Sequence, residues 1–176
     1  MSEEPSEPQG EPSPEPEPTP KPKPEPKTSD TWDSLKDIAK IIGTWAWLIG
    51  LINGSIGVLV GLVNLITAGI FSGITGLSFS TLITTSTYVW YIIGGAVTIV
   101  LSLVIVLPRF SNKCKNEDWE FLLNDVLVLG SFRFPLMLLW GALLSIFGFY
   151  VWGGVGVLVP AFMLLFAGPE PYEWTE

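Results

Sequence analysis

Charged side chains are missing from two long parts of this 176-residue chain. No Asp, Glu, Lys or Arg occurs in residues 41–108 or in residues 134–169. Both runs are rich in aliphatic residues, glycine and aromatic residues. A soluble domain of this size has too little interior to bury so many apolar side chains, so this absence excludes a water-soluble globular fold.

Histidine is absent as well, and Cys114 is the one cysteine. These absences remove the commonest catalytic base, an intramolecular disulfide and a cysteine-based metal site. No serine has a plausible base, and no set of carboxylates has the spacing of metal ligands. We therefore expect no enzymatic activity, no cofactor and no bound metal.

Positive charge is scarce, with nine Lys and Arg against 17 Asp and Glu. The cations are spread thinly and form no basic patch, which argues against a nucleic-acid partner. Proton relays, ion-coupled carriers and voltage sensors need ionisable groups at membrane depth, and the two uncharged runs contain none. The sequence therefore argues against these classes of transporter.

Proline is concentrated near the N-terminus, where the first 30 residues hold 10 of the 15 prolines. Alternate residues are proline from Pro12 onward to Pro26, which favours an extended polyproline II conformation. We expect residues 1–30 to form a disordered, acidic, proline-rich tail. Residues 169–176 form a short acidic tail at the other end, and residues 31–168 form a transmembrane domain.

The uncharged runs predict an all-α fold, a polytopic bundle of membrane-spanning helices. A spanning helix needs about 20 apolar residues. Four spans fit the runs, at about 41–66, 87–107, 134–149 and 153–167. The connector 67–86, rich in Gly, Ser and Thr, lies on the membrane, dips into it or crosses it as a fifth span. The charged segment before the third span has an apolar and an acidic face, which predicts an amphipathic interfacial helix over about 116–130.

Orientation follows from the positions of the cations. With four spans, all nine Lys and Arg residues fall on one side, and the positive-inside rule makes that side cytoplasmic. Both termini are then in the cytoplasm, and we expect the cell membrane as the location. A fifth span would move Arg109, Lys113 and Lys115 to the outside. Trp119 and Arg133 are predicted interface anchors on the cytoplasmic side.

Small residues recur on one face of two predicted spans. The candidates for helix packing are Gly43, Gly50, Gly54, Gly57 and Gly61 in the first span, with Gly141, Ser145 and Gly148 in the third. Such a stripe lets another helix approach closely. Packing within one bundle, self-association and the lining of a pore are three interpretations of the first stripe.

Asn53 lies beside that stripe as a buried polar residue. Its amide needs a hydrogen-bond partner at membrane depth. A structural hydrogen bond to another helix and a contact with a substrate or ion are its two interpretations.

No motif identifies a family. The leading functional prediction is a non-enzymatic structural, accessory or scaffold subunit that packs through its glycine-rich faces and projects a proline-rich spacer into the cytoplasm. Its expected partners are the lipid bilayer and a second protein, or further copies of itself, bound through those faces. The alternative is a channel or facilitator for small uncharged solutes.

Overall fold

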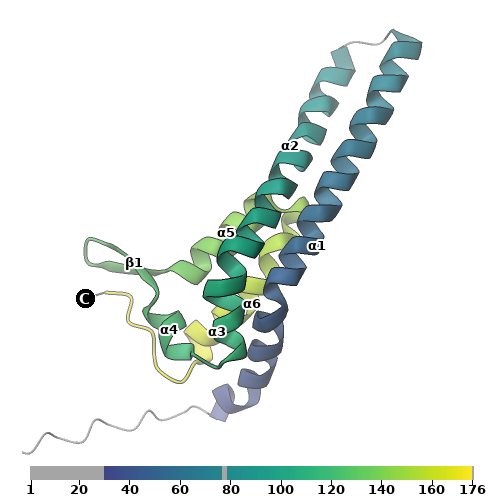
Figure 1. Cartoon of the computed structure of the whole chain (residues 1–176). Coiled ribbons are helices and arrows are strands. Elements are labelled where there is room, and N and C mark those ends of the chain that lie inside the picture. Colours follow the sequence, from purple (N-terminus) through teal and green to yellow (C-terminus); the bar gives the residue numbers. More distant parts are fainter. Residues whose placement is uncertain (1–29, 77–78, 176) are drawn as a thin grey trace, which may run out of the picture.

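The computed structural model describes residues 30–76 and 79–175 (Figure 1). Most of the predicted tail, residues 1–29, therefore lies outside the described residues. The helices are α1 Asp30–Thr75, α2 Phe79–Leu101, η1 Ser102–Ser111, α3 Asn112–Lys115, α4 Trp119–Asn124, α5 Leu136–Phe147, η2 Phe149–Gly154 and α6 Val155–Ala167. Two strands, β1 Val126–Leu129 and β2 Phe132–Pro135, form an antiparallel hairpin between α4 and α5.

The chain is mostly helical, as predicted. Three helical segments are long and apolar enough to cross a membrane, namely Asp30–Ile74, Thr85–Lys115 and Phe149–Ala167. Helix α5 is apolar as well but has only 12 residues. These lengths and compositions are consistent with a membrane protein.

Helix α1 is much longer than the predicted span 41–66. It has 46 residues and includes nearly half of the expected connector. The reason is local: hydroxyl groups there bond within the helix, Thr67 Oγ1 to Val63 O at 2.8 Å and Ser72 Oγ to Gly69 O at 3.0 Å. With no proline and no charge to interrupt it, the segment stays helical.

The second long helix passes Pro108 instead of ending at residue 107. Residues Ser102–Ser111 form a π-helix with Pro108 inside it, and α3 continues to Lys115. Hydrogen bonds now join residues five apart, as from the Asn112 N–H to Leu107 O. The wider turn accommodates the proline ring, so proline does not stop the helix.

The prediction of one interfacial helix over 116–130 is wrong, because this segment contains a short helix and a strand. Helix α4 has only six residues, and its start is capped by Asp118, which accepts a hydrogen bond from the Phe121 N–H at 3.3 Å. The following Val and Leu residues pair with β2 across the turn at Gly130. Gly130 has φ +67°, a conformation that glycine adopts without strain. Consecutive branched residues beside a glycine turn favour a strand over a helix.

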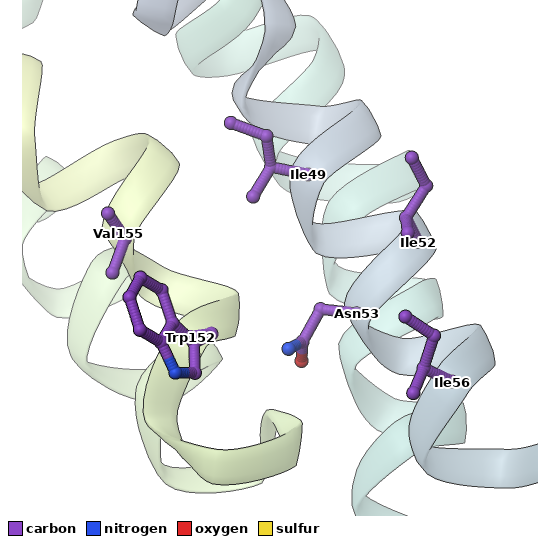
Figure 2. Close-up of a pocket in the computed structure, with 6 residues that line it drawn as sticks. All are labelled: Ile49, Ile52, Asn53, Ile56, Trp152 and Val155. Carbon is purple, nitrogen blue, oxygen red and sulfur yellow. The ribbon is translucent and has the colours of Figure 1, made fainter.

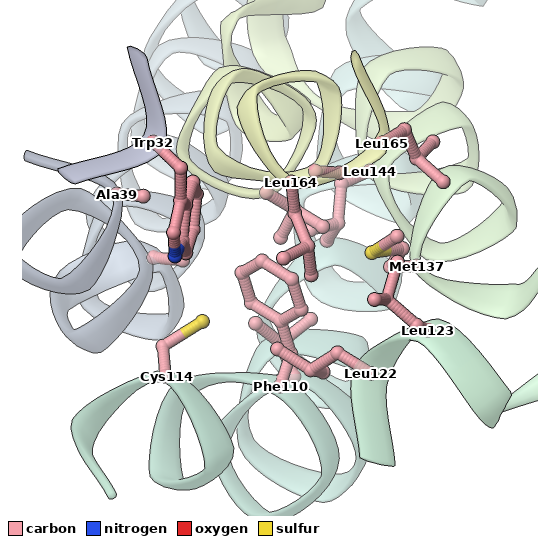
Figure 3. Close-up of a cluster of buried hydrophobic side chains, with 14 residues drawn as sticks. Trp32, Ala39, Phe110, Cys114, Leu122, Leu123, Met137, Leu144, Leu164 and Leu165 are labelled. Carbon is pink, nitrogen blue, oxygen red and sulfur yellow. The ribbon is translucent and has the colours of Figure 1, made fainter. Parts of the chain in front are cut away.

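Helices α5 and α6 form a short antiparallel pair beside α1 and α2 (Figure 1). Each begins and ends within two residues of its predicted span. The buried apolar core lies where this pair meets the first part of α1, η1, α3 and α4, and Figure 3 shows Phe110, Leu144 and Leu164 inside it. The far halves of α1 and α2 extend beyond the pair (Figure 1).

Candidate functional site

Five predicted glycines of α1 face the returning helix, and we call them the glycine seam. They are Gly43, Gly50, Gly54, Gly57 and Gly61. A Cβ atom at Gly54 would lie 2.6 Å from the backbone oxygen of Gly95. At Gly61 it would lie 2.8 Å from the oxygen of Tyr88. Both distances are too short for a real Cβ, so the close approach of the two backbones requires glycine there.

The other side of the seam comes from α2, η1 and α3. Gly43 lies against the side chain of Cys114, and Gly50 lies against Ser102. The buried hydroxyls on this side bond within their own helix, Thr98 Oγ1 to Gly94 O at 2.8 Å and Ser102 Oγ to Thr98 O at 2.7 Å. The chain thus covers its own glycine seam, and the seam lines no open path in the described part of the protein.

Asn53 connects α1 to η2, the turn between α5 and α6, which we call the tip of this pair. Its Nδ2 donates to Phe149 O at 3.0 Å, and its Oδ1 accepts from the Phe149 N–H at 2.8 Å. Phe149 precedes Tyr150 and Val151, whose positive φ angles of 50° and 67° break the helical hydrogen-bond pattern. The half-buried amide supplies bonds that the backbone lacks there. This geometry favours the structural interpretation of Asn53.

The predicted small residues of α5 contact the tip and α6. Gly141 lies against Leu158, Ser145 against Gly154, and a Cβ atom at Gly148 would be 2.9 Å from Asn53 Oδ1. The sequence analysis missed Gly156, where a Cβ would be 3.0 Å from the Cα of Ala46. The same search for small residues at helical spacing, extended to α6, could have found it.

An apolar groove of about 420 Å³ opens between α1 and the tip (Figure 2). Its lining residues are Ile49, Ile52, Asn53, Ile56, Trp152 and Val155. Asn53 is the only amide among them, and both ends of that amide are bonded to Phe149. The groove therefore has surface for an apolar chain but little that could orient a polar substrate.

Charged and aromatic side chains hold the segment around α4 against α1 and α3. Lys40 pairs with Glu117, and Lys113 Nζ lies 2.8 Å from Asp118 Oδ2. The hydrogen bond from each lysine lowers the pKa of its carboxyl partner. The rings of Trp32 and Trp119, a predicted anchor, are perpendicular, with their centroids 5.2 Å apart.

Arg133, the other predicted anchor, lies on β2 and joins it to the C-terminal segment. Its N–H donates to Trp174 O at 2.8 Å, and its carbonyl oxygen accepts from Tyr172 Oη at 3.0 Å. Burial raises the pKa of Tyr172, and the positive charge of Arg133 opposes that rise. Arg133 Nε is buried and has no hydrogen-bond partner in residues 30–76 and 79–175.

In the described residues, no three His, Cys, Asp or Glu side chains gather as a possible metal site. The chain matches no family of known proteins, and no curated protein or solved structure is similar to it.

Proposed function

We propose that this chain is a non-enzymatic multi-pass membrane protein that serves as a structural, accessory or scaffold subunit of a larger membrane assembly. The observation that carries the proposal is the glycine seam. Along its described length the two long helices meet through glycines and bonded hydroxyls, with no Asp, Glu, Lys or Arg between them. A closed interior of this kind favours a structural role over the transport of a solute.

The proposed topology has two full spans and one re-entrant pair. The apolar segment Phe149–Ala167 is not one regular helix, because Tyr150 and Val151 have positive φ angles. The regular helices α5 and α6 have only 12 and 13 residues, so they are about 18 and 20 Å long, against about 30 Å of hydrocarbon. Their tip is bonded to Asn53, about 20 Å along α1 from Lys40, the last charge before the membrane. We infer that the pair enters from the lysine side, turns inside the bilayer and returns to the same side. In this proposal, a re-entrant pair replaces the two complete spans expected from the sequence, and both termini remain on the same side of the membrane.

The cytoplasm is the proposed side for both termini. The six described cations lie toward the end where α1 begins: Lys36, Lys40, Arg109, Lys113, Lys115 and Arg133. Both described chain ends are there too, since Trp32 contacts Trp119 and Trp174 bonds to Arg133. The positive-inside rule then directs the proline-rich tail into the cytoplasm, and we propose the cell membrane as the location.

A partner must bind somewhere other than the glycine seam, because the chain itself covers it. We propose the part of α1 beyond Gly61, where the α5 and α6 pair no longer accompanies it. Ile70 and Ile74 are exposed there, and a Cβ atom at Gly69 or Gly73 would meet no atom of the described residues within 4 Å. Small residues next to exposed isoleucines offer a second helix a close approach.

Site-specific photocrosslinking in native membranes tests this function. A photoreactive residue at Ile70, which is 61% exposed, should give one discrete protein adduct. The matched control is Ile41, 62% exposed on the same helix, which should give lipid adducts only. The experiment is repeated without residues 1–29 to measure what the tail contributes. Lipid adducts alone at Ile70, together with a monomer in mild detergent, would refute a subunit role.

A further inference from the structure

The β1 and β2 hairpin carries apolar side chains on both faces, and Arg133 is its one charged residue. Leu127, Leu129 and Phe132 share one face, because Leu129 pairs with Phe132 and Leu127 pairs with Phe134. Val128 and Arg133 pair on the opposite face. Leu129 is 62% exposed and Val128 is 49% exposed, so apolar side chains project from both sides. A soluble hairpin normally keeps one face polar.

The hairpin extends sideways from the bundle, between α4 and the start of α5 (Figure 1). Its base is closed by a hydrogen bond of 2.9 Å from the Leu136 N–H to Asp125 O. The charged α4 precedes this base, and the wholly apolar α5 follows it. The hairpin therefore leaves the bundle where the charged end of the protein meets its apolar helices.

The backbone of the hairpin limits how deep in a bilayer the hairpin can lie. Strand β2 is paired on both edges, with β1 on one side and with Trp174 and Thr175 on the other. The outer edge of β1 has no partner strand among the described residues. An open edge cannot lie in hydrocarbon, because its N–H and C=O groups need water or headgroups. Its apolar side chains, in turn, disfavour bulk water.

We propose that the hairpin, together with Trp174, lies flat in the interfacial layer of the cytoplasmic leaflet, at the boundary between phospholipid headgroups and acyl chains. A protein partner would cover one face, whereas in this layer one face of the hairpin meets acyl chains and the other meets headgroups. Trp174 stacks on Phe132 with ring centroids 5.9 Å apart, and tryptophan favours this layer. Arg133 brings a positive charge to the same sheet, where lipid phosphates are its natural counterpart. The proposal rests on the topology proposed above.

Depth-dependent fluorescence quenching tests this placement, with the full chain in phosphatidylcholine and phosphatidylglycerol nanodiscs that hold one copy each. A Leu129→Cys variant carries an environment-sensitive dye, and buried Cys114 stays unlabelled. Glu120→Cys on α4 is the aqueous control, and Ile52→Cys on α1 is the deep control. Lipids spin-labelled near the headgroup, lipids spin-labelled near the chain end, and aqueous iodide are the quenchers.

We expect the dye at Leu129 to be quenched at least twofold more by the shallow spin label than by either other quencher. Iodide quenching equal to that at Glu120 would place the hairpin in water and overturn the proposal. Protection from all three quenchers would mean that protein covers it, which also overturns the proposal. If the spin-labelled lipids do not quench the dye at Ile52, the proposed topology is wrong. If the dye at Ile52 behaves as expected and only the dye at Leu129 deviates, the hairpin proposal alone is wrong.

Discussion

Replacing Gly54 by alanine should loosen the contact between the two long helices. The added Cβ would lie 2.6 Å from Gly95 O, whereas ordinary contact begins near 3.4 Å, so the helices must separate locally by about 0.8 Å. The obstructing atom belongs to the backbone and cannot turn away as a side chain can. Overpacking of this kind costs about 1–3 kcal/mol of unfolding free energy.

A matched variant separates this cost from the effect of alanine on helix propensity. Gly69→Ala lies on the same helix, and its Cβ would meet none of the described atoms within 4 Å. Both substitutions gain the same propensity, about 1 kcal/mol. The difference between them therefore reports the packing cost alone, and Gly54→Ala should be less stable than Gly69→Ala by about 1–3 kcal/mol.

Reversible unfolding in mixed micelles with increasing SDS, followed by tryptophan fluorescence, measures this difference. The reciprocal variant Gly95→Ala should behave like Gly54→Ala, since its Cβ would lie 2.5 Å from Gly54 O. If Gly54→Ala and Gly69→Ala prove equally stable, the two backbones do not approach as closely as described, and the argument from the glycine seam fails.

Three further predictions concern other parts of the protein. Asn53→Leu removes both hydrogen bonds to Phe149, so the unfolding free energy should fall by about 1–3 kcal/mol and amide hydrogen exchange should rise at residues 149–151; unchanged exchange would contradict the role of this amide. The pKa values of Glu117 and Asp118 are lowered, so their ion pairs stabilise fully above the ordinary carboxyl pKa and lose that stabilisation as the pH falls through the lowered values. Tryptophan fluorescence should therefore report release of α4 in acid below about pH 4. A variant with both lysine partners, Lys40 and Lys113, changed to methionine should lack that transition. Gly130→Ala forces alanine to φ +67° and should cost about 1–2 kcal/mol, read as faster amide exchange across the hairpin; the exposed substitution Ser131→Ala is its control.

The candidate site was predictable in part because helical spacing is a local property. Glycines at steps of three, four and seven residues must share one face of a helix, whatever lies opposite. The same spacing placed Asn53 beside that face. Which surface would cover the glycines could not be predicted, since packing within the bundle and contact with another copy leave the same pattern in the sequence.

Other features could not be predicted from the spacing of residues within one segment. The π-helix around Pro108 is a local geometry that hydropathy cannot reveal, and it faces Gly50 through Ser102. The hairpin was mistaken for a helix because its apolar residues continue the face begun in α4. Strand β1 pairs with β2 across a two-residue turn, and β2 pairs in addition with Trp174 and Thr175, a long-range contact that no spacing within 116–130 indicates.

The sequence by itself indicated a membrane protein, because two long runs without charge can be buried only in lipid or in each other. It also determined where helices could approach closely, since only glycine leaves room for a second backbone. The tertiary structure decided what fills that room, namely the chain's own returning helix. It also decided where the short pair lies along α1, because the two hydrogen bonds of Asn53 hold the tip at one level of that helix.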